Sequence, residues 1–257
     1  MSTLAYSDTG TGLPVVLLHA FPFDRELWEP QRPALAGAGY RVILPDLPGF
    51  GQSPPGPEPL TVDGLADAVA DLLTRLGVER AVVGGLSMGG YVALAVARRH
   101  PGRLAGLILA DTKADPDDEV ARRNRDQAIA SLRTHGVAPF VQALLPKLLG
   151  PQALADPAVV EAVRGIATRQ SAPALTATLA ALRDRPDATP GLAAVSVPTL
   201  VVVGEDDAVT PPSAAEKLAA AIPGAELVRL PGAGHLANRE APEAFTTAVL
   251  AFLRRCR

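Results

Sequence analysis

The chain is short of cysteine, of excess positive charge and of long apolar segments, and each shortage excludes a class of protein. Cys256 is the only cysteine among 257 residues, so no disulfide can form within the chain and nothing requires an oxidising compartment. The 24 basic and 27 acidic residues give a net charge of -3, without the basic cluster that nucleic-acid binding needs. We therefore expect small neutral or weakly charged molecules as partners, and no nucleic acid.

Signals for export or membrane insertion are also missing. Residues 1–8 (MSTLAYSD) lack a basic segment followed by an apolar core, and no uncharged apolar stretch approaches about 18 residues. These features predict a soluble cytoplasmic protein without membrane contact. We expect no metal and no cofactor, and the oligomeric state is left open.

Apolar residues are abundant, at 48% of the chain, which is enough for a sizeable core. Short apolar runs predict strands at 15–18, 41–44, 81–83, 106–110, 199–203 and 225–230. Helical patterns lie near 27–38, 62–76, 88–99, 213–222 and 242–254. This alternation predicts a mostly parallel sheet covered on both faces, with functional groups at the carboxyl ends of its strands.

One long interval breaks the alternation. Residues 115–195 contain helical, proline-punctuated segments and no convincing strand. Such an interval is too long for a plain loop, so we interpret it as a helical cap over the functional edge of the sheet. The alternative is an ordinary pair of crossover helices packed on the sheet. Residues 1–114 and 196–257 would then form the core domain.

A serine lies at a turn between a predicted strand and a predicted helix. The motif GLSMG, residues 85–89, follows the apolar run 81–84 and precedes the helical run 91–97. A sharp strand-to-helix turn lifts a serine hydroxyl clear of the backbone and places it at a helix N-terminus. Glycines two residues to either side avoid collisions with the neighbouring strand and helix. The pattern predicts that Ser87 is a nucleophile.

The serine needs a base, and a carboxylate must orient that base. Among four histidines, His235 follows the last predicted strand, where it can reach the carboxyl edge of the sheet. Three acids, Glu205, Asp206 and Asp207, follow the strand 199–203. We favour Asp207, because the turn needs a residue or two beyond the strand before a side chain can point back to the histidine loop, and we expect Glu205 and Asp206 to face solvent. The order Ser87, Asp207, His235 is the one expected for this architecture.

Two backbone N–H groups are needed to stabilise an oxyanion. The N–H of Met88 is one candidate, at the positive end of the helix. The second is expected from the loop HAFP, residues 19–22. We favour Phe21, because Pro22 has no N–H and restricts the residue before it. His19 is expected to brace this loop.

These motifs, together with DLPGFGQS at residues 46–53, resemble the α/β-hydrolase superfamily over nearly the whole chain outside the 115–195 interval. The resemblance implies an α/β-hydrolase fold with an eight-stranded, mostly parallel sheet and a cap inserted between strands 6 and 7. Small carboxylesterases, 3-oxoadipate enol-lactonases and cofactor-free haloperoxidases or perhydrolases are the most similar groups. Ser87 argues against haloalkane dehalogenases and epoxide hydrolases, which carry aspartate at that position. Ala20 departs from the usual glycine and cannot freely adopt a positive φ.

The expected activity is cleavage of small carboxylic esters, as in a carboxylesterase, through an acyl-enzyme on Ser87. A lactonase or enol-lactonase is an alternative, and it would need a cation for a substrate carboxylate; the candidates are Arg122, Arg123, Arg125 and Arg133. A perhydrolase or acyltransferase would use the same triad with another acceptor. A ligand-binding protein on the same scaffold would lack turnover. The residues expected to line the pocket are Phe21, Met88, Leu236, Phe140 and Leu144.

Overall fold

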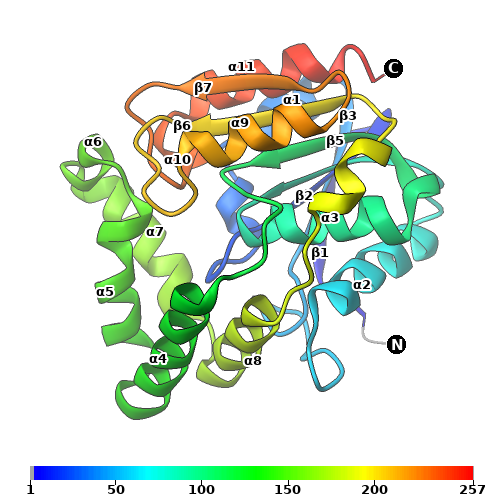
Figure 1. Ribbon diagram of the computed structural model, residues 1–257. Coiled ribbons are helices and arrows are strands. Elements are labelled where there is room, and N and C mark those ends of the chain that lie inside the picture. Colours follow the sequence, from blue (N-terminus) through cyan, green and yellow to red (C-terminus); the bar gives the residue numbers. More distant parts are fainter. Residues whose placement is uncertain (1–2, 257) are drawn as a thin grey trace.

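The apolar runs of the sequence form one sheet at the centre of the computed structural model, which describes residues 3–256 (Figure 1). The sheet has seven strands in the order β1-β3-β2-β4-β5-β6-β7. Their bounds are β1 (Tyr6–Thr9), β2 (Leu13–Leu18), β3 (Tyr40–Pro45), β4 (Ala81–Leu86), β5 (Leu104–Ala110), β6 (Thr199–Gly204) and β7 (Glu226–Leu230). The strands β4 and β6 are buried along their whole length, as expected for parallel strands covered on both faces.

The expectation of eight strands is corrected, because seven segments within residues 3–256 are hydrogen-bonded into the sheet. All neighbouring pairs are parallel except β1 with β3, which is antiparallel. The strand β1 was not predicted from the sequence. Its four residues, YSDT, carry little apolar signal, and their side chains are exposed or half-buried at the sheet edge.

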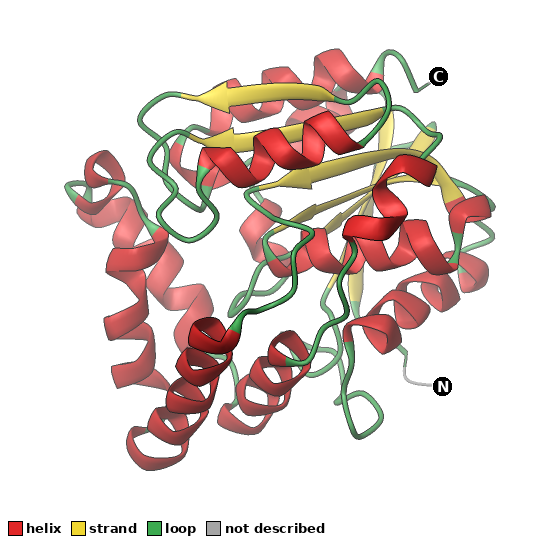
Figure 2. Cartoon of the chain, viewed as in Figure 1, coloured by secondary structure: helices red, strands yellow, loops and turns green. Residues whose placement is uncertain are grey.

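Helices cover both faces of the sheet (Figure 2). On one face lie α2 (Val62–Arg75), α3 (Met88–Arg99) and α9 (Pro212–Ala221) (Figure 1). On the other lie α1 (Arg32–Gly37) and α11 (Pro242–Leu253). The single helix predicted at 27–38 is divided into a 3₁₀ turn η1 (Arg25–Trp28) and α1. Pro30 between them has no N–H to continue the helix, whereas Pro33 lies in the first turn of α1, where none is needed.

Five helices lie between β5 and β6, in the segment that we call the insertion (residues 115–195). They are α4 (Glu119–His135), α5 (Val137–Leu148), α6 (Pro151–Leu154), α7 (Pro157–Thr168) and α8 (Ala172–Arg183), followed by a 3₁₀ turn η3 (Thr189–Ala194). In Figure 1 they extend beyond the carboxyl ends of the strands and do not cover a face of the sheet. Asp118, Asp156 and Ser171 accept hydrogen bonds from backbone N–H groups at the starts of α4, α7 and α8.

The position of the insertion within the sheet also differs from the expectation. It connects the fifth strand to the sixth, not the sixth to the seventh, because the described sheet has one strand fewer. Within residues 3–256, no helix combines the length and apolar character needed to cross a membrane.

Candidate active site

Ser87 forms the turn between β4 and α3, and its backbone is held in an unusual conformation. Its φ of 54° and ψ of -112° lie outside the regions that non-glycine residues normally adopt. The Ser87 N–H donates to the carbonyl of Ala110 at 2.9 Å, and its own carbonyl accepts from the hydroxyl of Thr112 at 2.8 Å. Both contacts come from the end of the neighbouring strand, so the sheet fixes the turn.

The two glycines of the motif make room for this turn. A Cβ at position 85 would collide with the backbone of Gly89, and a Cβ at position 89 would collide with the carbonyl of Leu18 on β2. The backbone segments therefore approach more closely than any other residue would allow. A helix N-terminus can then begin directly after Ser87.

The Ser87 hydroxyl lies against the imidazole of His235, and the imidazole lies against Asp207. The distance from Ser87 Oγ to His235 Nε2 is 2.8 Å, and the distance from His235 Nδ1 to Asp207 Oδ2 is also 2.8 Å. An ionised carboxylate only accepts, so Nδ1 carries the proton and leaves Nε2 free to accept from the serine. The predicted serine, histidine and acid are thus joined in one hydrogen-bonded chain.

The choice among the three acids follows from the turn after β6. Asp207 is buried, whereas Glu205 and Asp206 are exposed. Asp207 Oδ1 accepts from the N–H groups of Val209 and Thr210 at 2.8 and 2.9 Å, and Oδ2 accepts from the Thr210 hydroxyl at 2.6 Å. Burial raises the pKa of Asp207, but the charge of His235 and these hydrogen bonds outweigh it, so the net pKa is lowered. The carboxylate therefore stays ionised beside the imidazole.

A second carboxylate holds the loop that carries His235, and sequence reasoning did not find it. Glu240 follows the loop in α10 (Ala237–Glu240); its Oε2 accepts from Gly234 N–H at 2.9 Å and its Oε1 from Leu236 N–H at 2.9 Å. Its Oε2 also accepts from Gly150 N–H in the insertion at 2.7 Å. The Glu240 carboxylate thus accepts hydrogen bonds from the residues on both sides of His235. Only the folded backbone brings these N–H groups together, so no sequence spacing signals the contact.

Asp111, at the end of β5, is another acid that the sequence did not single out. It is fully buried with a φ of 43°, and its Oδ1 accepts from Gly204 N–H at 2.8 Å. Burial, with the nearby charge of Asp207, raises the pKa of Asp111 well above its ordinary value. Asp111 therefore joins the ends of β5 and β6, near Asp207.

In the described chain, the backbone N–H groups of Phe21 and Met88, which the sequence predicts as oxyanion donors, are not occupied by other hydrogen bonds. Within residues 3–256, neither the N–H of Phe21 nor that of Met88 donates a hydrogen bond to another residue. Met88 is the first residue of α3, where N–H groups point out of the helix without partners. Both groups can therefore donate to an added oxygen atom.

The loop before Phe21 is braced by His19, as expected. His19 Nε2 accepts from Leu47 N–H at 2.9 Å, its Nδ1 lies 3.0 Å from the Ala20 carbonyl, and its ring contacts Phe50 edge-on. Complete burial lowers the pKa of His19, which fits a neutral ring that accepts on one side and donates on the other. Ala20 is not strained, because the positive-φ residues of the described chain other than glycine are Ser87 and Asp111.

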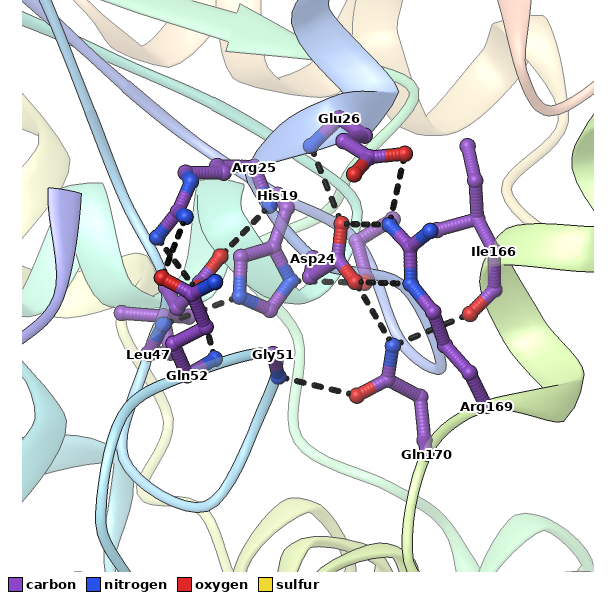
Figure 3. Close-up of polar contacts among 12 residues, drawn as sticks. His19, Asp24, Arg25, Glu26, Leu47, Gly51, Gln52, Ile166, Arg169 and Gln170 are labelled. Carbon is purple, nitrogen blue, oxygen red and sulfur yellow. Dashed lines mark hydrogen bonds and ion pairs between the residues drawn. The ribbon is translucent and has the colours of Figure 1, made fainter. Parts of the chain in front are cut away.

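A polar cluster connects this loop to the insertion (Figure 3). The Asp24 carboxylate, three residues after Phe21, accepts from Arg169 Nε and Nη2 and from Gln170 Nε2, all at 2.8 Å. Gln170 Oε1 accepts from Gly51 N–H at 3.0 Å. The end of α7 is therefore attached both to the loop that carries Phe21 and to the loop that follows β3.

A cavity of about 560 Å³ lies over Ser87 and His235, between the sheet edge and the insertion. Among the predicted pocket residues, Phe21, Phe140 and Leu144 line it, and the rings of Phe21 and Phe140 meet with centroids 6.2 Å apart. Met88 and Leu236 are corrected, because both side chains are 0% exposed and neither lines the cavity. Their side chains fill the core below the site.

The cavity wall also carries charged residues. They are Lys113, Asp117, Arg125 and Lys147. Of the four arginines considered from the sequence, only Arg125 lines the cavity, and its Nε is 3.0 Å from Asp117 Oδ2. Within residues 3–256, no cluster of three or more His, Cys, Asp or Glu side chains is arranged to hold a metal ion.

The fold agrees with comparisons to known proteins. The family model described as alpha/beta hydrolase fold matches residues 14–242, which is most of the chain. This chain belongs to the α/β-hydrolase fold family. It is a hydrolase of that family. The names of its relatives refer to different substrates and include esterases, enol-lactonases and carbamate hydrolases.

Two solved structures resemble this α/β hydrolase along nearly its whole length. A thermophilic esterase from Thermogutta terrifontis, solved with malate bound, is 43% identical with a TM-score of 0.95, covering 98% of this chain and 93% of the esterase. The enol-lactonase from Burkholderia xenovorans LB400 is 30% identical with a TM-score of 0.91, covering 98% and 97%. A curated relative is the dihydrolipoyllysine-residue acetyltransferase component of the acetoin cleaving system of Pseudomonas putida, 36% identical over 95% of this chain. The chain spans 64% of the length of that relative.

Proposed function

We propose that this α/β hydrolase cleaves small carboxylic esters through an acyl-enzyme on Ser87. The observation that carries the proposal is the continuous hydrogen-bonded chain from Ser87 through His235 to Asp207, at the floor of a 560 Å³ cavity. A nucleophile, a base and an orienting acid within hydrogen-bond reach are the requirements for acyl transfer. The esterase resemblance supports ester substrates, and the size of the cavity suits a small molecule.

The first half of the reaction forms the acyl-enzyme. His235 Nε2 takes the hydroxyl proton as Ser87 Oγ bonds to the carbonyl carbon, and the carbonyl electrons move onto oxygen. The N–H groups of Phe21 and Met88 stabilise that oxyanion. When the intermediate collapses, the bond to the alcohol oxygen breaks, and His235 gives its proton to the leaving alcohol.

The second half releases the acid. Water enters, His235 takes its proton, and the water oxygen bonds to the acyl carbon. The second oxyanion collapses by breaking the bond to Ser87 Oγ, which regains its proton from His235. Asp207 keeps its charge throughout and stabilises the imidazolium that forms in each half.

The insertion acts as a lid in this proposal. Residues 115–195 form one wall of the cavity through Phe140, Leu144 and their neighbours, and the described core, residues 3–114 and 196–256, provides the floor. The insertion shapes the cavity above the sheet edge, where the chemistry takes place. Lactones are the second candidate substrate, supported by the 30% identity to an enol-lactonase and by the cations in the cavity wall.

The test compares the Ser87→Ala variant with the unchanged protein on p-nitrophenyl butyrate. We expect turnover to fall on the order of 10⁵ to 10⁶-fold, because the nucleophile is removed. A fluorophosphonate probe should label the unchanged protein at Ser87. The Ser213→Ala variant, at an exposed serine of α9, is the control and should keep both activity and labelling. Unchanged hydrolysis by Ser87→Ala, with its near-ultraviolet circular dichroism intact, would refute the proposal.

A further inference from the structure

Lys113 lines the catalytic cavity, yet its ammonium group has no hydrogen bond or ion pair within residues 3–256. It lies three residues beyond the end of β5, and β5 is the neighbour of β4, which ends one residue before Ser87. The preceding residue, Thr112, donates its hydroxyl to the Ser87 carbonyl at 2.8 Å. The backbone of Lys113 therefore directly follows a residue that is hydrogen-bonded to the backbone of the nucleophile.

Asp117, the buried carboxylate that also lines the cavity, is already paired with other cations. Asp117 Oδ1 is 2.6 Å from Arg185 Nη1, and its Oδ2 is 3.0 Å from Arg125 Nε. Burial lowers the pKa of Lys113, and the nearby Arg185 lowers it further, against opposing effects of Asp117 and Asp115. The lysine is thus half-buried among positive charges without a carboxylate of its own.

The charge of the cavity is opposite to that of the whole chain. The charged residues of its wall are three cations, Lys113, Arg125 and Lys147, and one acid, Asp117, whereas the chain as a whole carries a net charge of -3. Such a local excess in a partly enclosed cavity attracts anions. The remaining wall is largely apolar, through side chains such as Phe140, Leu144 and Leu179, and suits a hydrocarbon chain.

We propose that Lys113 binds a carboxylate carried by the substrate, so that the preferred esters or lactones are those with a second, free carboxylate. This inference rests on the proposed ester hydrolysis at Ser87. The ion pair forms equally in the bound substrate and in the transition state, so Lys113 contributes to substrate affinity and not to the chemical step.

The experiment uses two substrate pairs that differ only in charge. In the first pair, mono-4-nitrophenyl glutarate is compared with its uncharged amide, 4-nitrophenyl glutaramate, so that the carboxylate is on the acyl side. In the second, 4-acetoxybenzoate is compared with 4-acetoxybenzamide, so that it is on the leaving group. The selectivity is the ratio of kcat/KM for the anionic ester to that for its neutral partner, corrected for spontaneous hydrolysis.

We expect the unchanged protein to prefer the anionic ester at least tenfold in one pair. The Lys113→Met variant should lose at least tenfold of that selectivity, mainly through a higher KM, and Lys113→Arg should restore part of it. The chain offers a matched control, because it has only three lysines and Lys217 is exposed on α9. Lys217→Met removes the same charge and should keep the selectivity. Added salt should reduce the preference of the unchanged protein, because ions screen the pair.

Two outcomes overturn the inference: no anionic preference in either pair, or a preference that survives Lys113→Met. Failure of the proposed function would look different, because no ester would be cleaved and no probe would label Ser87. Titration of glutarate by calorimetry then tests Lys113 alone. The inference requires that glutarate binds the unchanged protein at least tenfold more tightly than it binds Lys113→Met. Equal binding to both proteins, or no binding to either, would contradict the inference.

Discussion

Asp24 and Arg169 form a bidentate ion pair across 145 residues of sequence, with both hydrogen bonds at 2.8 Å. Asp24 is almost fully buried, whereas the Arg169 side chain is 42% exposed. The pair attaches the end of α7 to the loop that carries Phe21 (Figure 3). Because the arginine keeps contact with water, solvent screens the attraction between the two charges.

The Asp24→Asn variant should lose about 1 to 3 kcal/mol of unfolding free energy, since the new amide faces donors on Arg169 and Gln170. Urea denaturation measures the loss as a lower midpoint at unchanged slope. The control is Glu119→Gln, which removes an exposed pair with Arg123 and should change stability by about 0.5 kcal/mol or less. An Asp24→Asn midpoint equal to that of the unchanged protein would contradict the prediction.

The contribution of Asp24 should depend on pH. Burial raises its pKa, but the hydrogen bonds of Arg169, Glu26 N–H and Gln170 outweigh it, so the folded pKa is below the ordinary 3.8. For a lowered acid pKa, the stabilisation is complete above the unfolded pKa and is lost as the pH falls through the folded one. The difference in stability between the unchanged protein and Asp24→Asn should therefore be constant above about pH 5 and shrink below pH 3.8. A difference that grows on acidification would contradict this sign.

Asp207→Asn should lower kcat for p-nitrophenyl butyrate on the order of 10³ to 10⁴-fold, with little change in KM. An amide cannot stabilise the imidazolium and can hold His235 in the wrong tautomer. Steady-state kinetics with both variants is the measurement, and Asp206→Asn is the matched control, since Asp206 is the exposed neighbour in the same turn. If Asp206→Asn were the slower enzyme, the assignment of the orienting acid would be wrong.

Two glycine variants should have opposite effects on stability. Gly89→Ala should cost about 3 kcal/mol or more and abolish activity, because the added methyl group collides with the Leu18 carbonyl. Gly165→Ala, at an exposed position inside α7 with open space around it, should stabilise by about 0.5 to 1 kcal/mol. Thermal unfolding should show the second change as a rise of about 1 to 4 °C. A melting temperature that rises in Gly89→Ala would contradict the close approach of β2 and α3.

Much of the fold was predictable because it depends on patterns that are local in the sequence. Six of the seven strands have an apolar run that is visible in the sequence, and the exception, β1, is short and polar. The motif around Ser87 was visible for the same reason, since steric demands fix its glycines. Local patterns therefore located the sheet edge and the nucleophile.

The supporting residues of the site were not predictable, because their roles depend on where distant backbone segments meet. Thr210 donates its N–H and hydroxyl to Asp207, and Glu240 accepts from the N–H groups of Gly234 and Leu236. Only the folded turns bring these groups together. Met88 and Leu236 were expected in the pocket from their neighbours in sequence, yet both side chains point into the core. In the sequence, Lys113 looks like any other loop lysine. Only the structure shows that Asp117 is paired with Arg125 and Arg185 and does not pair with Lys113.

Glu240 should act on the reaction through the loop of His235. In Glu240→Gln, one acceptor oxygen is replaced by an amide that faces backbone N–H groups, so at least one of the three contacts is lost. An unsatisfied buried N–H costs about 1 to 3 kcal/mol, and displacement of His235 should lower kcat about tenfold or more. The rate of fluorophosphonate labelling should fall in parallel, because it depends on the same base.

The control for this position is Glu243→Gln, an exposed acid at the start of α11, which should leave both rates unchanged. A merely structural role would lower the melting temperature of Glu240→Gln without slowing the labelling of protein that is still folded. Labelling rates measured well below the melting temperature therefore separate the two roles. An unchanged rate there would show that the carboxylate stabilises the loop but does not position the imidazole against Ser87.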